Sequence, residues 1–193
     1  TVSFRGMWHE ERLLVDGGLV PAEGNRTYPT EDPSTGEQLG TAADASVADA
    51  ARAVAAARRA FDTTGWATDT ALRLRCLRQL HQALVDHIEP LRELVVAEVG
   101  SPRSFAEGPG VDTPVSIVAW YADLLEKYDF TQGLGLAEFM GRMSERWVEK
   151  EAVGVVAAIV PSNAPVQITL AKLVPALAAG CTVVVKGPPQ APW

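Results

Sequence analysis

The feature that most limits the fold of this chain is a strand, helix and strand pattern near its carboxyl end. Residues 154–160 form a nearly continuous apolar run, residues 166–179 carry apolar side chains at helical spacing, and residues 182–186 form a second apolar and β-branched run. Apolar runs of this kind are typical of parallel strands that are covered on both faces. The pattern therefore predicts a βαβ unit with a right-handed crossover, which belongs to an α/β fold.

The residues before this unit predict a surface hairpin, a reverse turn and a series of helices. Residues 13–21 indicate two short strands joined at Gly17 and Gly18, and residues 31–39 contain the Asp, Pro, Ser and Gly that favour a turn. Ser46 is a suitable N-cap for the first helix. Apolar spacing predicts helices, in chain order, at residues 46–61, 72–88, 91–99 and 111–128.

The same spacing predicts where these helices end and which side chains they expose. Pro90 is expected to separate the second helix from the third, and the Gly and Pro residues at 108–110 are expected to link the third to the fourth. Three arginines of the second helix are expected to face solvent: Arg73, Arg75 and Arg78.

Two polar residues follow the two predicted parallel strands. Asn163 lies between Pro161 and Pro165, just after the first strand, and Lys186 closes the second. Parallel strands end at the same edge of a sheet, where ligands bind in α/β proteins, so both side chains are expected to face one ligand. The Asn163 amide suits either a cap for the following helix or a donor to an oxyanion on a carbonyl group. The Lys186 ammonium suits either a solvated strand end or a nucleotide ribose or phosphate, although no G-x-G-x-x-G follows the first strand.

Composition narrows the kinds of partner and the compartment. A formal net charge of −7 and a pI of about 5.0 argue against nucleic-acid binding. Cys76 and Cys181 form no disulfide framework and have no zinc spacing, which indicates the cytoplasm. Residues 1–10 carry no secretion signal, and no apolar run is long enough for a membrane helix. No metal site is expected, because the histidines lack ligand spacing: His9, His81 and His87.

Long segments of the chain closely resemble the aldehyde dehydrogenase superfamily. The resemblance is carried by residues 154–165 (GVVAAIVPSNAP), 172–180 (KLVPALAAG) and 182–186 (TVVVK). Upstream, the hairpin at 15–18 and the turn at 32–37 resemble that family's N-terminal region in the same order. The resemblance covers nearly the whole chain but less than half of a typical member. It implies N-terminal helical segments followed by the first βαβ unit of a truncated, Rossmann-like sheet that binds NAD or NADP.

The resemblance also implies a reaction and roles for individual residues. In that family a cysteine thiolate attacks an aldehyde, a hydride passes to the nicotinamide, and a glutamate-activated water hydrolyses the thioester to a carboxylic acid. Asn163 would be the oxyanion donor, Lys172 would lie near the proton path of the catalytic base, and Lys186 would contact the adenosine ribose. The residues that would line the cofactor are Ile159, Val160, Pro161, Ser162 and Pro189.

Three positions depart from the family pattern. Ser162 stands where many members have Trp and Ala164 where many have Phe, which implies a wider approach for the substrate. Pro189 stands where NAD-preferring members often have Glu, so the choice between NAD and NADP stays open.

Core packing is expected for Cys76 and Cys181, so the catalytic cysteine and the catalytic glutamate are expected beyond residue 193. The 193-residue chain alone is therefore expected to be inactive.

The resemblance divides the chain into three parts. Residues 1–130 would be the N-terminal part of the cofactor-binding domain, residues 131–151 an oligomerisation arm, and residues 152–193 the start of the NAD(P)-binding sheet, with the catalytic domain absent. Within the arm, residues 131–135 are expected to interrupt regular secondary structure. Residues 142–150 alternate polar and apolar side chains and are expected to form a half-exposed strand. We expect a homodimer or homotetramer that acts on a small-molecule aldehyde. The alternative is a non-catalytic relative that keeps this fold for oligomer assembly or ligand binding.

Overall fold

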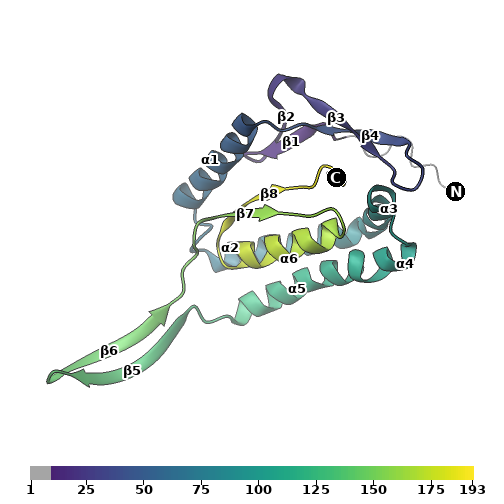
Figure 1. Ribbon diagram of the computed structural model, residues 1–193. Coiled ribbons are helices and arrows are strands. Elements are labelled where there is room, and N and C mark those ends of the chain that lie inside the picture. The colour runs from purple at the N-terminus through teal and green to yellow at the C-terminus, as the bar shows by residue number, and fades with distance from the viewer. Residues whose placement is uncertain (1–9) are drawn as a thin grey trace.

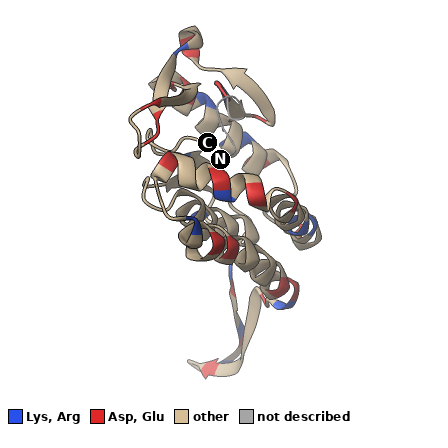
Figure 2. Ribbon diagram, turned by 90° about the vertical axis from the view of Figure 1, so that its right-hand side faces the viewer, with Lys and Arg blue, Asp and Glu red and all other residues tan. Residues whose placement is uncertain are grey.

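The computed structural model describes residues 10–193, and it is a mixed α/β structure. Two short hairpins and α1 lie along one side, β7 and β8 lie in the middle, and α2, α5 and α6 lie on the other side (Figure 1). The predicted α/β class is confirmed. No helix within residues 10–193 is long and apolar enough to cross a membrane. Acidic and basic residues are scattered over the helices and the arm (Figure 2).

The N-terminal hairpins follow the predicted pattern closely. Strands β1 (Arg12–Val15) and β2 (Gly18–Pro21) pair antiparallel, and β3 (Thr27–Glu31) pairs with β4 (Gln38–Ala43). The first turn is formed by Asp16 and Gly17, which have φ values of 56° and 75°, and not by the two glycines. Two successive positive φ angles are what a type I′ turn needs, so Gly18 is left to begin β2. A 3₁₀ turn, Glu23–Asn25, links the two hairpins.

Helix α1 (Val47–Thr63) begins at the predicted cap. The Ser46 side chain accepts a hydrogen bond from the Asp49 N–H, and the Asp49 carboxylate accepts one from the Ser46 N–H, which completes a capping box. Asp49 also accepts from the Glu23 N–H at 3.0 Å. These backbone donors, with Glu23 first, lower the pKa of Asp49. The capping residue therefore also ties α1 to the hairpin region.

In helix α2 (Thr70–Asp86), the prediction that all three arginines face solvent is wrong for one of them. Arg75 and Arg78 are exposed, as expected, but Arg73 is only 2% exposed. Its guanidinium donates to the carbonyl oxygens of Trp66 and Ala67 at 2.9 and 2.8 Å and to further acceptors described below. A buried cation is tolerated because its donors are paired in this way.

Two more helices complete the body. Helix α3 (Ile88–Val99) includes Pro90 in its first turn, where a missing N–H costs nothing, so Pro90 does not separate two helices as predicted. Gly100 ends α3 with a φ of 67°, and a Cβ there would lie 2.9 Å from Pro33 Cγ. A short α4 (Arg103–Phe105) and a π-helical turn (Ala106–Gly110) lead into α5 (Asp112–Lys127).

The main hydrophobic core lies between α2, α3, α5 and α6. It is completed by the turn before α5, and its side chains come from segments far apart in the sequence. Its buried members are Leu77, Val95, Ala106, Val111, Val115, Val118, Ala122, Leu125, Leu170, Val174 and Ala178.

A long antiparallel hairpin projects from the body (Figure 1). It consists of β5 (Thr131–Phe139) and β6 (Arg142–Glu149), with a bulge between Gly133 and Gly135. The strand at 142–149 is confirmed. The prediction that residues 131–135 interrupt regular secondary structure is wrong, because these residues belong to β5. Nearly every side chain of this arm is exposed.

The predicted βαβ unit is confirmed. β7 (Val155–Ile159), α6 (Pro165–Ala178) and β8 (Thr182–Lys186) follow in order, and the two strands are parallel. Both strands contact α1 and α6. Ile159 and Val185 are nevertheless 65% and 43% exposed, so in the described chain the prediction of two fully covered faces is wrong for these side chains.

Candidate cofactor and oxyanion site

The carboxyl ends of β7 and β8 lie at one edge of the sheet. Ile159 is in register with Lys186, and the N–H of Val160 donates to the carbonyl oxygen of Lys186 at 3.1 Å. The loop after β7, which carries Asn163, therefore begins beside the end of β8. This agrees with the expectation that parallel strands bring both residues to the same edge.

Asn163 does not cap the helix that follows it. The N-cap of α6 is Ala164, which makes no side-chain cap hydrogen bond, and Pro165 occupies the first turn as predicted. Asn163 is exposed, and among residues 10–193 its amide has no hydrogen-bond partner. The capping interpretation is therefore wrong, and the amide is available to a ligand at the sheet edge.

The other predicted cofactor-lining residues differ in the exposure of their side chains. Ile159, Pro161 and Pro189 are exposed and Ser162 is half-buried, so these side chains are accessible to a ligand. Val160 is 3% exposed, so its side chain packs inward. Val160 could meet a ligand at the edge only through its backbone.

Lys172 lies further from the edge than the residues of the loop. It is exposed on α6, seven residues after Pro165, which places it two helical turns along the helix. No contact within the described part of the chain links it to Asn163, so its role stays a prediction.

The amino end of the β7–β8 pair is anchored by hydrogen bonds to α1 and the α1–α2 loop. Thr182 Oγ1 donates to the Ala57 carbonyl at 2.9 Å, and Trp66 Nε1 donates to the Cys181 carbonyl at 2.8 Å. Gly180, with a φ of 92°, packs so closely that a Cβ would lie 2.9 Å from the Ala67 carbonyl oxygen. These contacts fix where β8 starts and therefore where it ends.

Arg73 also stabilises the amino end of the β7–β8 pair through hydrogen bonds. Its Nε donates to the Ala178 carbonyl at 3.1 Å and its Nη2 to Thr70 Oγ1 at 3.1 Å. Burial lowers the pKa of Arg73, and the carbonyl acceptors offset the loss of water. The guanidinium thus joins the end of α6 to the loop before α2.

Glu98 is a residue that the sequence patterns missed. It is 5% exposed, and its Oε1 accepts a hydrogen bond from the Trp193 N–H at 3.0 Å. Burial raises the pKa of Glu98 to about 7, and the Trp193 bond opposes this rise. Because residues 187–193 follow Lys186 directly, this bond holds the loop that carries Pro189. The helical spacing could have indicated the burial of Glu98, because Glu98 lies three and four residues after the buried Val95 and Leu94 and therefore on the same helix face.

Cys76 and the described histidines belong to α2 and its C-terminal end, and Cys181 precedes β8. Cys181 is buried at the start of β8, the opposite end from Lys186, and Cys76 is half-buried on α2. His81 is half-buried and His87 is exposed, whereas His9 lies outside the described residues. No cluster of His, Cys, Asp and Glu within residues 10–193 has the arrangement of a metal site.

The fold and the edge together define an α/β protein with a candidate ligand site at the carboxyl ends of parallel strands. Residues 19–193 match the aldehyde dehydrogenase family. The chain belongs to this family.

Individual relatives agree with this assignment. The chain is 35% identical over 182 residues to an aminoacetaldehyde dehydrogenase of Pseudomonas aeruginosa, which covers 93% of this chain and 36% of the relative. It is 32% identical to an NADP/NAD-dependent aldehyde dehydrogenase of Escherichia coli K12, with 95% and 36% covered. An aldehyde dehydrogenase of Bacillus cereus solved with NAD+ superposes with a TM-score of 0.87 at 31% identity, with 95% and 37% covered. The chain thus spans little more than a third of the length of these relatives.

Proposed function

We propose that this chain is the cofactor-binding part of an NAD(P)-dependent aldehyde dehydrogenase, which oxidises an aldehyde to a carboxylic acid. The observation that carries the proposal is the Val160 to Lys186 hydrogen bond of 3.1 Å, since it joins the Asn163 loop to the end of β8. The oxidoreductase names of the relatives support the same reaction class. Residues 152–193 would then begin a Rossmann-like sheet that further strands extend.

The residues at the edge suit a nicotinamide dinucleotide. Lys186 offers ammonium donors to a ribose, and the exposed Ile159 and Pro161 offer apolar surface to a flat ring. When bound, the nicotinamide ring accepts a hydride from the substrate. Pro189 brings no carboxylate to the ribose hydroxyls, so the edge accommodates either NAD or NADP.

Asn163 would stabilise negative charge on the aldehyde oxygen during the reaction. Its amide is held between Pro161 and the α6 terminus and is not engaged in capping, so it needs no rearrangement to donate. Lys172 would act two turns further along α6, near the proton path. The nucleophilic thiol would be neither Cys76 nor Cys181, because neither lies at this edge. It would belong to the part of the family fold that this chain does not cover in its relatives.

The β5–β6 arm would be the oligomerisation element of a homodimer or homotetramer. Its exposed apolar side chains, Trp147 among them, are of the kind that pair with another chain. A non-catalytic relative would keep this arm and the sheet edge, so only an activity measurement separates it from the enzyme.

The test is Asn163→Ala in the intact protein, assayed by NADH and NADPH formation with a panel of aldehydes. Loss of an oxyanion donor should lower kcat on the order of 10²-fold. Gln167→Ala is the matched control, because Gln167 is an exposed amide in the first turn of α6 that no role here requires. A raised KM with unchanged kcat would contradict the role of Asn163. No turnover by the wild-type protein with any aldehyde would favour the non-catalytic relative.

A further inference from the structure

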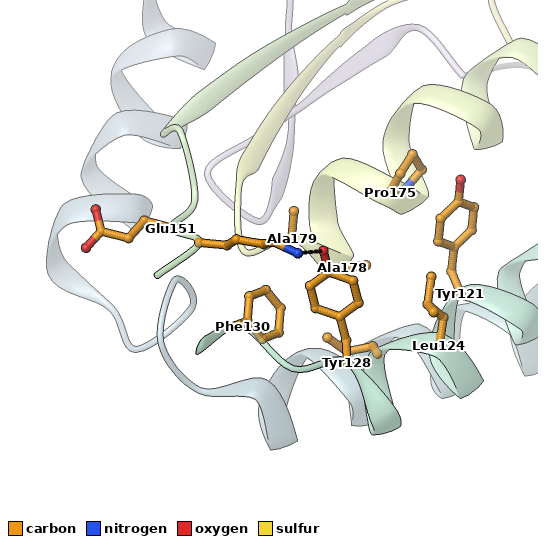
Figure 3. A pocket seen from close by; sticks show the side chains of 10 residues that line it. Tyr121, Leu124, Tyr128, Phe130, Glu151, Pro175, Ala178 and Ala179 are labelled. Carbon is orange, nitrogen blue, oxygen red and sulfur yellow. Dashed lines mark hydrogen bonds between the residues drawn. The ribbon is translucent and has the colours of Figure 1, made fainter. Parts of the chain in front are cut away.

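A hollow of about 280 Å³ opens at the base of the arm, away from the sheet edge (Figure 3). It lies between the end of α5, the two ends of the β5–β6 arm and the last turns of α6. Pro175 and Ala178 on α6 line it, whereas Asn163 precedes the other end of the same helix. At 1.5 Å per residue the two ends of α6 are about 20 Å apart, so the hollow is separate from the proposed cofactor site.

The hollow contains one cation without a carboxylate partner. The Lys150 Nζ donates to the Tyr128 hydroxyl oxygen at 2.9 Å and lies 4.8 Å from the centre of the Tyr128 ring. No ion pair within the described residues involves Lys150, and Figure 3 shows the Glu151 carboxylate directed away from Tyr128 and Phe130. An ammonium has three N–H donors, so two remain. The Tyr128 O–H donor also remains, because its oxygen accepts from Lys150 and its proton has no acceptor among the described residues.

Apart from Glu151, whose carboxylate points away from the rings, the rest of the hollow is apolar and largely aromatic (Figure 3). Tyr128 and Phe130 stand edge to face, with ring centres 4.8 Å apart and planes at 67°. Tyr121 and Leu124 of α5 and Pro175 of α6 form the neighbouring wall (Figure 3). Such a wall accepts a flat or branched apolar group and offers nothing to a second charge.

We propose that this hollow binds a small carboxylate with an aromatic or branched apolar body. The carboxylate would accept hydrogen bonds from the Lys150 ammonium and the Tyr128 hydroxyl, whose Nζ and oxygen atoms lie 2.9 Å apart. The body would lie against Tyr121, Leu124 and Pro175. Charge complementarity favours an anion, because the Lys150 ammonium attracts a carboxylate and repels a cationic ligand. The proposal is independent of dehydrogenase activity, because it uses none of the residues at the sheet edge.

The experiment titrates phenylacetate and its neutral counterpart 2-phenylethanol into the intact protein by calorimetry. Phenylacetate should bind at least about tenfold more tightly than the alcohol, since hydrogen bonds to charged groups are the stronger ones. Lys150→Met should weaken phenylacetate binding by a similar factor and leave the weak binding of the alcohol unchanged. Lys127→Met is the matched control, because Lys127 is an exposed lysine in the last turn of α5 that does not line the hollow.

Two further measurements keep the outcome clear. Tyr128→Phe removes one proposed donor and keeps the ring, so it should weaken phenylacetate binding less than Lys150→Met does. Thermal melts of each variant check that the fold is intact. Equal affinity for acid and alcohol, or phenylacetate affinity that Lys150→Met does not change, would overturn the proposal. It would also be overturned if phenylacetate did not bind. A changed oligomeric state of Lys150→Met would then indicate that another chain covers the hollow.

Discussion

Replacing Glu98 by Gln should change how the stability of the protein depends on pH. The Glu98 carboxyl is almost fully buried, and this burial raises its pKa from 4.5 to about 7. Gln is nearly the same size, and its Oε1 can still accept the hydrogen bond that Trp193 donates at 3.0 Å. The substitution therefore removes the ionisation and keeps the contact that holds residues 187–193.

The sign of the effect follows from the two pKa values. Since the folded-state pKa lies above the unfolded-state value, the folded protein binds more protons between pH 4.5 and about 7. Its free energy of unfolding therefore falls as pH rises through this interval. A tenfold change in proton affinity corresponds to about 1.4 kcal/mol. Ionised Glu98 should thus cost the fold on the order of 3 kcal/mol above neutral pH and nothing at about pH 4.

The assay is urea unfolding of the intact wild-type protein and the Glu98→Gln variant at several pH values. The two free energies of unfolding should agree within about 1 kcal/mol at low pH, and the variant should be the more stable by roughly 3 kcal/mol at about pH 8. Glu145→Gln, an exposed glutamate of β6, is the control and should follow the wild type at every pH. A constant difference between Glu98→Gln and wild type at all pH values would refute the reasoning, because it would mean that Glu98 does not titrate differently in the fold.

Three further outcomes are expected. Lys186→Ala should raise the Kd for NAD or NADP about tenfold in a fluorescence titration, and unchanged values for both cofactors would remove Lys186 from the site. Arg73→Met should lower the free energy of urea unfolding by about 3 kcal/mol, because buried carbonyls lose their donors, whereas Arg75→Met on the exposed face should have little effect. Light scattering should find a dimer or tetramer that Trp147→Glu shifts towards monomer, and a wild-type monomer would contradict the role of the arm.

The βαβ unit could be predicted from the sequence because its information is local. The apolar runs at 155–159 and 182–186 are continuous rather than alternating, as in parallel strands, and the helical spacing between them favours a βαβ crossover. The common edge of Asn163 and Lys186 followed from that arrangement alone. The capping alternative for Asn163 is wrong, because Ala164 takes the N-cap position and makes no side-chain cap hydrogen bond.

Two of the errors arise from partners that the local sequence pattern does not show. Arg73 reads as a solvent-facing residue in its own helix, but its acceptor Ala178 lies 105 residues away. The glycines at 133 and 135 read as a break, but pairing with β6 satisfies the β5 backbone, and Gly135 adopts a φ of 73° at the bulge. Pairing of this kind does not follow from local propensity.

The two ends of the β7–β8 pair are held in different ways, and this difference bears on the site. At the amino end, Thr182 and Cys181 are bonded to Ala57 and Trp66, so the start of β8 is fixed to α1 and its following loop. At the carboxyl end, Trp193 holds the loop after Lys186 to the body through two hydrogen bonds: its N–H donates to Glu98 Oε1 at 3.0 Å, and its Nε1 donates to the Glu10 carbonyl at 3.4 Å. Pro188 and Ala191 of this loop are buried. The candidate cofactor edge therefore combines a strand start that is anchored to α1 with a following loop that Trp193 anchors to α3 and to Glu10.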